Sequence, residues 1–240
     1  MNKRFYSVSV LWMLCLVALL TGCGREAQQR QAFISFLQKE VIPRNSGILI
    51  PDRATRKKFG VYATHYDVIV ESNRAILEKV GRPLERLQRE YQDAMKPEAN
   101  VEERRAAIIK FREALQSIEI TLDNELATTG VEIEKLSQPD DLEGVFIKAV
   151  EKHIRTPSKS LKAMIPAIEK MMSKNLDLLD FIAANKGKVE IKDGMIQVDR
   201  NKDKDQSVLM HLNEMQTEIL KMAQAIQRQH NEFTRQSISK

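Results

Sequence analysis

The chain has 240 residues, with 38 lysines and arginines against 33 aspartates and glutamates, a net charge of +5. This length is ample for a domain with its own hydrophobic core. So small a basic surplus is no footprint of nucleic-acid binding, which requires basic residues gathered on one face. Glycine and aromatic residues are scarce. Alanine, leucine, glutamate, lysine and glutamine abound, and this composition predicts a helical protein.

The first residues predict a secretory leader. Lys3 and Arg4 precede an apolar stretch over residues 8–20, which is too short to cross a bilayer as a helix because that takes about 20 residues. The stretch ends in Leu20-Thr21-Gly22-Cys23, which resembles the lipobox of bacterial lipoproteins. We therefore predict a signal peptide over residues 1–22 and lipid attachment at Cys23. The alternative is an ordinary secretory signal that has a cysteine near its cleavage site by chance.

Lipid attachment at Cys23 would fix the location of the mature chain. Removing 22 of the 240 residues leaves 218, and Cys15 leaves with the leader, so the mature chain has no other thiol and no disulfide. Lipoproteins of this class usually carry three acyl chains, palmitate among them, which hold a membrane far more firmly than one chain does. The next residue is Gly24 rather than aspartate, which in such lipoproteins implies export to the outer membrane. The predicted location is its periplasmic face, and the inner membrane remains open.

The mature chain begins with a predicted lipidated tether over residues 23–28, of which the five residues from Gly24 to Gln28 would reach about 17 Å if extended. A helix is expected from Gln29 to Pro43, followed by a loop to Pro51. Asp52 is the predicted N-cap of a short helix that stops near Gly60.

The middle of the chain shows helical periodicity. Apolar residues recur at threes and fours over residues 61–95, and Gly81 with Pro83 predicts a break or kink. Asn100 and Glu103 form a capping-box pattern at the start of a helix that extends to about Leu136. A shorter helix is expected from Pro139 to about Ile154. Thr156-Pro157 then predicts the start of another, which runs to about Ala184 and bends at Pro166.

Residues 188–198 break the helical pattern. Asp193-Gly194 is a strong two-residue hairpin turn, and counting outward pairs Ile191 with Ile196 and Val189 with Val198. Asp203 or Asp205 is expected to cap a last helix. That helix has a coiled-coil-like apolar seam; its members are Val208, Leu212, Met215, Ile219, Met222, Ile226 and Phe233.

The sequence therefore predicts an all-α protein, an antiparallel helical bundle with long coiled-coil-like helices and one small β-hairpin near the C-terminus. A single domain is expected over residues 29–240.

Three segments carry a resemblance to a family: Gln29-Arg30-Gln31-Ala32-Phe33-Ile34-Ser35-Phe36-Leu37-Gln38, Arg56-Lys57-Lys58-Phe59-Gly60 and Asp193-Gly194-Met195-Ile196-Gln197. They are similar to the enterobacterial lipoproteins typified by YiaF, whose domain has no known function. The resemblance implies an exported helical domain. It implies no catalytic residue.

The chemistry-bearing residues form no recognisable catalytic, metal or cofactor site. His65, His153, His211 and His230 are too far apart in sequence to give a two-histidine helix face, and we interpret them as surface or boundary residues. The segment from Asp199 to Asp205 has a lysine where a calcium loop needs glycine, and is interpreted as a solvated connection. The acidic pairs Glu102-Glu103 and Asp140-Asp141 fall in predicted first turns of helices, where they complement the helix dipole.

Three functions remain open. The first is a non-enzymatic envelope lipoprotein that binds another protein as a scaffold. The second is a small-molecule or lipid-binding module, because seven of eight mature methionines fall between Met164 and Met222 and methionine suits adaptable apolar grooves as well as cores. The third is an enzyme acting on peptidoglycan or envelope lipid. The basic run Arg53, Arg56, Lys57 and Lys58 is interpreted as a solvated helix face, with contact to anionic lipid headgroups as the alternative.

Overall fold

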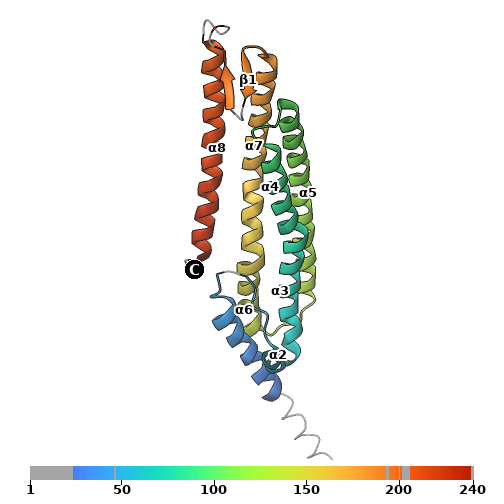
Figure 1. Ribbon diagram of the computed structural model, residues 1–240. Helices are drawn as coiled ribbons and strands as arrows, with labels where there is room; N and C mark the ends of the chain where they lie inside the picture. Colours follow the sequence, from blue (N-terminus) through green and yellow to red (C-terminus); the bar gives the residue numbers. More distant parts are fainter. Residues whose placement is uncertain (1–23, 46, 193–194, 200, 202–205, 239–240) are drawn as a thin grey trace, which may run out of the picture. The chain divides into compact units, whose positions relative to one another are not determined.

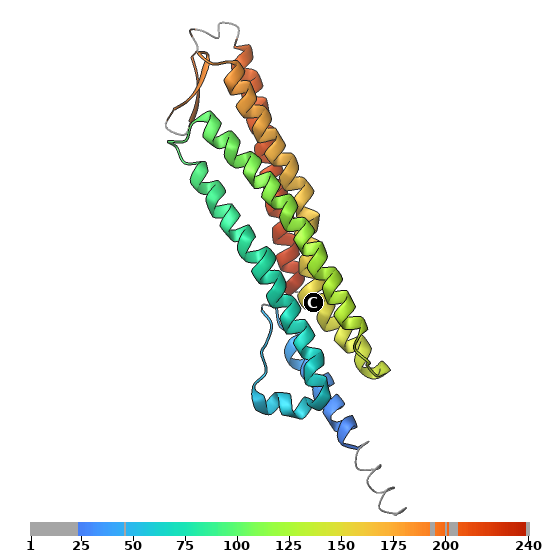
Figure 2. The same ribbon diagram turned by 90° about the vertical axis from the view of Figure 1, so that its right-hand side faces the viewer.

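The computed structural model describes residues 24–45, 47–192, 195–199, 201 and 206–238 (Figures 1 and 2). These residues confirm the predicted all-α fold with one small hairpin. They divide into two compact units. Unit 1 holds the described chain up to Asn73 together with Thr129–Ile154, and unit 2 holds Arg74–Thr128 together with the described chain from Arg155 onward. The single domain over residues 29–240 stays a prediction.

Several predicted features lie outside the described residues. These are the signal peptide, Cys23, the turn residues Asp193 and Gly194, and the helix caps Asp203 and Asp205.

The described part of unit 1 begins in a helix, within the segment that was predicted as a tether. Residues 24–28 are helical and exposed, and the helix continues to residue 36. The segment from Arg25 to Gln29 contains only good helix formers, so nothing in it favours an extended strand over a helix. The remaining elements of unit 1 are η1 (Leu37–Val41), α2 (Arg53–Phe59), η2 (Gly60–Tyr62), most of α3 (Ala63–Ile76), the end of α5 (Val101–Glu134), α6 (Asp140–Val150) and most of η4 (Glu151–Arg155).

The core of unit 1 is rich in aromatic rings. Phe36 lies between Phe59 and Tyr66, with ring centroids 4.9 and 5.2 Å away. Phe33 packs against the same group, 5.3 Å from Phe59. Aromatic pairs at such distances add to the free energy gained from burial. Phe33 and Phe36 of the N-terminal helix are therefore part of the core.

Unit 2 is built from longer helices. The helix α4 (Arg82–Ala94) follows η3 (Leu77–Gly81), and α7 (Thr156–Ala184) and α8 (Ser207–Ile238) pack against each other. Figure 2 shows α5 in green beside α4 and α7. The capping box at the start of α5 is confirmed, because Asn100 Oδ1 accepts from Glu103 N and Asn100 N donates to Glu103 Oε2, both at 2.9 Å. Ile108, Leu115 and Leu122 of α5 are fully buried or nearly so.

The hairpin lies in unit 2 and has the predicted register. Strand β1 (Val189–Lys192) pairs antiparallel with β2 (Met195–Val198), Val189 opposite Val198 and Ile191 opposite Ile196. Apolar side chains of both strands pack on the helix core, whereas Glu190 and Gln197 are exposed. This burial explains how a two-stranded sheet, marginal by itself in water, is held.

Three π-helical turns stand at fixed distances from prolines. The turns η1, η3 and η4 end two residues before Pro43, Pro83 and Pro157. A proline inside an α-helix lacks an N–H and its ring clashes with the carbonyl four residues earlier. That carbonyl belongs to a residue of the π-turn in each case, and the wider turn moves it away from the ring.

Because the π-turns accommodate the prolines, two predicted helix boundaries were wrong. The helix does not break at Gly81 and Pro83, and α6, η4 and α7 follow one another without the interruption expected at Thr156-Pro157. Pro166 lies within α7 in an ordinary α-helical stretch, so the π-turn is one way to accommodate a proline rather than a requirement.

Among the described residues, no helix combines the length and apolar character that crossing a bilayer would take.

Candidate functional site

The short helix α2 presents the densest basic surface of unit 1. Asp52 caps it, since Thr55 N donates to Asp52 Oδ1 at 2.6 Å, and this hydrogen bond holds the pKa of the Asp52 carboxyl below its usual value. Phe59 anchors the helix in the core. The basic residues Arg53, Lys57 and Lys58 are exposed.

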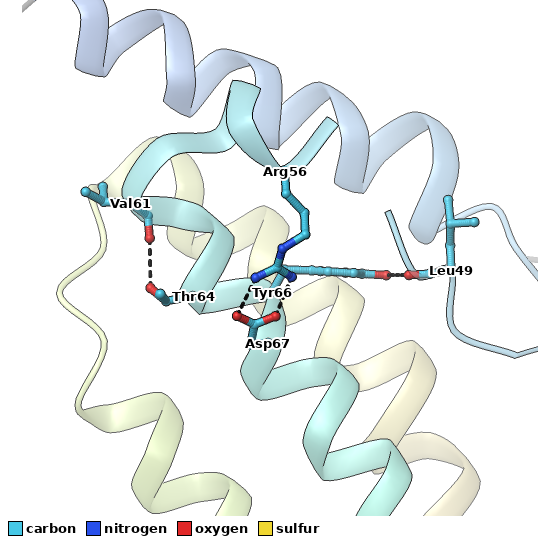
Figure 3. A network of polar contacts seen from close by, with 6 residues as sticks. All are labelled: Leu49, Arg56, Val61, Thr64, Tyr66 and Asp67. Atoms are coloured by element: carbon cyan, nitrogen blue, oxygen red, sulfur yellow. Dashed lines mark hydrogen bonds and ion pairs between the residues drawn. The ribbon is translucent and has the colours of Figure 1, made fainter. Parts of the chain in front are cut away.

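Arg56 differs from the other basic residues of α2. Its Nη1 and Nη2 donate to the two carboxylate oxygens of Asp67, at 2.5 and 2.8 Å (Figure 3). This two-point contact fixes α2 on α3 and orients both side chains. Only three of the four residues in the predicted basic run are therefore available to a partner.

The end of α2 touches the first turns of the N-terminal helix. Tyr62 Oη donates to Glu26 Oε1 at 3.1 Å. Gly60 adopts φ 57° and ψ −124°, a conformation that favours glycine, and a Cβ there would lie 2.0 Å from Gln29 Oε1. Val61, between these two contacts, is 63% exposed, and its side chain points away from the Arg56–Tyr66 network in Figure 3.

A groove of about 550 Å³ runs along the other side of α2. The loop after Pro43 forms one wall of this groove. Tyr66 holds that loop in place, because its hydroxyl donates to the Leu49 carbonyl at 2.6 Å (Figure 3). Burial raises the pKa of that hydroxyl. The groove combines apolar and charged side chains; it is lined by Ala32, Ser35, Phe36, Lys39, Glu40, Leu49, Ile50, Pro51, Asp52, Thr55, Lys58 and Phe59.

Two of the four histidines are buried, which the surface-or-boundary interpretation did not foresee. His153 is 9% exposed and its Nε2 lies 2.8 Å from the carbonyl of Val41. A carbonyl only accepts, so Nε2 carries the proton. Burial lowers the pKa of His153, and the hydrogen bond to Val41 opposes this.

His65 is 8% exposed and fills a space between aromatic rings. Its ring meets Tyr62 edge-on at 5.2 Å, and its Nδ1 lies 3.2 Å from Gln138 Nε2. Burial lowers its pKa too. His211 and His230 are exposed on α8, as expected.

The burial of both histidines had a signal in the sequence. His153 continues the spacing of Leu142, Phe146 and Ala149, all fully buried. His65 lies three residues after Tyr62 and four before Ile69. If histidine is counted among the apolar residues of each helix, the helical spacing predicts that both His65 and His153 lie in the core.

The remaining predicted features are structural in the described chain. Glu103 completes the capping box of α5, and Asp141 pairs with Arg30 at 3.2 Å. Asp199 Oδ1 accepts from Asn201 N at 3.0 Å, as in a turn. No group of three or more histidine, cysteine or acidic side chains that could hold a metal ion occurs among the residues described.

Unit 2 contains a second groove, beside the hairpin, of about 450 Å³. Its lining is mostly apolar and comes from the start of α5, the end of α7 and β1: Asn100, Val101, Glu102, Ile182, Ala183, Lys186, Val189, Glu190 and Ile191. The methionines between Met164 and Met222 are divided between core and surface, because Met172 is 3% exposed whereas Met195 and Met210 are 62% and 64% exposed. No methionine lines this groove.

Comparisons with known proteins agree with the family suggested by the sequence. The chain is 27% identical over 179 residues to the uncharacterized protein YiaF of Escherichia coli strain K12, and equally to that of Shigella flexneri, covering 71% of this chain and 72% of each relative. No solved structure is significantly similar to it. A family model described as "Protein of unknown function (DUF3053)" matches residues 11–236. The chain belongs to this family of proteins of unknown function.

Proposed function

We propose that the chain is a non-enzymatic lipoprotein of the bacterial cell envelope, anchored through acyl chains on Cys23, that acts as a scaffold for another envelope protein. The observation that carries the proposal is Leu20-Thr21-Gly22-Cys23 at the end of an apolar stretch. The structure supports it, because the described chain is helical from residue 24 onward and enters the core of unit 1 at Phe33, close to the proposed anchor.

Long helices with exposed apolar side chains support the scaffold role. The helices α5, α7 and α8 have 34, 29 and 32 residues, so each is about 45–50 Å long. Ile120 on α5 is 63% exposed, and Met210 and Leu220 on α8 are 64% and 58% exposed. Such side chains offer anchor points for a partner without serving the core.

Replacing the cysteine tests the anchor. Mass spectrometry of the exported protein should find acyl chains on Cys23, and the protein should sediment with the outer membrane. Cys23→Ser should release it into the soluble periplasmic fraction or leave its leader uncut. A wild-type chain with a free N-terminal cysteine that washes off membranes would contradict the proposal.

A photocrosslinking amino acid tests the scaffold role. Placed at Ile120 or Leu220 in intact cells, it should trap one reproducible envelope protein. Glu190, which is exposed on the polar face of the hairpin, is the matched control position and should give a different, weaker pattern. Random neighbours at all three positions would argue against a scaffold.

The hairpin groove favours lipid or small-molecule binding as the second candidate function. A volume of about 450 Å³ lies within the range of ligand sites, and the apolar lining suits an acyl chain. Native mass spectrometry of protein extracted from membranes should then show a bound lipid. Ala183→Trp should abolish that adduct, whereas Ala184→Trp, which replaces the next exposed alanine of α7 outside the lining, should retain it.

A further inference from the structure

We propose that the exposed residues Arg53, Lys57, Lys58 and Val61, hereafter the α2 surface, lie against an anionic lipid surface and orient unit 1 on the membrane. The proposal deepens the proposed function and rests on it for the attachment at Cys23. The occupant is a bilayer with acidic headgroups such as phosphatidylglycerol.

The net charge of unit 1 differs between the two segments of chain that form it. Residues 24–73 contain eight basic and five acidic side chains, whereas residues 129–154 contain three basic and six acidic ones. One part of the unit therefore has a surplus of three positive charges and the other a surplus of three negative charges. The segment that contains α2 is therefore the one whose net charge favours an anionic surface.

The carboxylates that touch α2 are already engaged. Asp67 is paired with Arg56, and Asp52 accepts from the backbone of Thr55 and lies near Lys58. The helix itself contains no acidic residue. Its exposed positive charges are thus only partly offset within the protein, and a lipid phosphate can take their place as partner.

The α2 surface lies beside the first described residues of the chain. The Tyr62–Glu26 hydrogen bond, and a Gln29 side chain so close that a Cβ at Gly60 would clash with it, place the end of α2 and η2 beside the first described turns of the N-terminal helix. Lipid attached at Cys23 would bring a bilayer to these turns. Val61, 63% exposed between the two contacts, is the apolar side chain best placed to enter the headgroup region.

The mature chain allows a single fluorescent tryptophan to be introduced as a reporter of membrane contact. Its one tryptophan is at position 12, within the predicted leader, and Cys23 is the one cysteine of residues 23–240. The mature chain can therefore be coupled through the Cys23 thiol to a maleimide lipid in vesicles, independently of acylation in the cell. Val61→Trp then places a single fluorophore on the α2 surface. Ile120→Trp, on a side chain that is also 63% exposed, is the matched control.

In vesicles that contain phosphatidylglycerol and a headgroup-nitroxide lipid, the tryptophan at position 61 should be quenched strongly and that at position 120 weakly. In phosphatidylcholine vesicles, or at high salt, the difference should shrink because the attraction is electrostatic. Equal quenching at both positions, or quenching at position 61 that ignores lipid charge and salt, would overturn the proposal.

A charge variant tests the basic residues directly. Arg53→Gln, Lys57→Gln and Lys58→Gln together should weaken docking of the coupled chain at least about tenfold, since each basic residue near an anionic surface contributes about fivefold. The control removes as much charge from unit 2, through Lys170→Gln, Lys192→Gln and Lys221→Gln, and should leave docking unchanged. Circular dichroism checks that both variants fold. An equal effect of the two sets would contradict docking through α2.

The vesicle test and the test of the proposed function fail independently. Mass spectrometry of Cys23 decides whether the cell attaches lipid. The coupled chain decides whether the α2 surface recognises acidic headgroups once it is near them.

Discussion

His153 links three segments of unit 1 through two of its atoms. Its ring Nε2 donates to Val41 at the end of η1, and its backbone carbonyl accepts from Asn73 Nδ2 of α3 at 3.3 Å. A buried polar group that loses such partners costs about 1–3 kcal/mol. His153 is therefore a structural residue, and its titration is coupled to folding.

The first prediction concerns pH. Burial lowers the pKa of His65 and His153 below the unfolded value of 6.5, so the unfolded chain binds more protons than the folded chain below that pH. The free energy of unfolding should be fully retained above about pH 6.5 and should fall as pH decreases from there. Urea unfolding at pH 7.5, 6.5 and 5.5 measures it. His153→Gln should flatten the fall, and His211→Gln, at an exposed site, should not.

The second prediction concerns Gly60. Gly60→Ala should lower the free energy of unfolding by about 1–3 kcal/mol, because φ 57° with ψ −124° is strained for any residue with a Cβ. The Gln29 side chain that would meet the new Cβ is flexible. Adding Gln29→Ala should therefore recover little of the loss, as measured by thermal melting. Full recovery would mean that the clash, and not the backbone, determines the cost.

At the scale of elements, the π-turns show how helices pass through prolines. Pro157 has no N–H to donate to the carbonyl of His153, and Asn73 donates to that carbonyl from another helix. A gap in the hydrogen bonding of one helix is thus filled by the side chain of its neighbour, which also fixes how the two helices pack.

The third prediction tests this substitution of partners. Asn73→Ala should cost about 1 kcal/mol of stability in the wild-type chain. Pro157→Ala restores an N–H four residues after His153, so the cost of Asn73→Ala should be smaller in that background. A double-mutant cycle measures the coupling. The control is Asn175→Ala. The Asn175 side chain donates to the Met171 carbonyl within its own helix, so its removal should show no coupling to Pro157→Ala.

Most elements could be predicted from the sequence, and the misses have physical causes. Asp52, Asn100 and the hairpin register follow local rules that depend on a few neighbouring residues. The prolines were misleading, because a helix ends two residues before Pro43 but continues through Pro83 and Pro157. A π-turn precedes all three prolines, so they differ in whether the helix continues after it, and the apolar spacing of the sequence did not reveal that difference.

At the scale of the molecule, composition and periodicity sufficed for the fold class but not for the two units. The periodicity of α3 and α5 continues past the boundaries at residues 73–74 and 128–129. Apolar spacing therefore gives no sign of where one compact unit ends. The candidate site was only partly predictable: the basic run of α2 is visible in the sequence, whereas its approach to Gln29 and Glu26 depends on tertiary contacts.

The fourth prediction follows from those boundaries. The chain passes between the units three times, each time inside a helical element: α3, α5 and η4. Unfolding of one unit would unwind helices that also form part of the other unit, so we expect a single cooperative thermal unfolding transition. Leu142→Ala in unit 1 and Leu115→Ala in unit 2 remove fully buried side chains, at about 2–5 kcal/mol each. Both should lower the same calorimetric transition, and two peaks that move separately would refute this.

The helical segment at residues 24–28 sets a rotational phase as well as a distance. Its five residues rise by about 7.5 Å, less than half their extended reach, and each turns the helix by about 100°. One alanine inserted after Arg25 would turn Gly24 and Arg25 by about 100° around the helix axis relative to Phe33, whereas four would bring them back to within about 40° of their original direction. Under the proposed acylation of Cys23, the side of unit 1 that faces the lipid would therefore depend on the number of helical residues before Phe33.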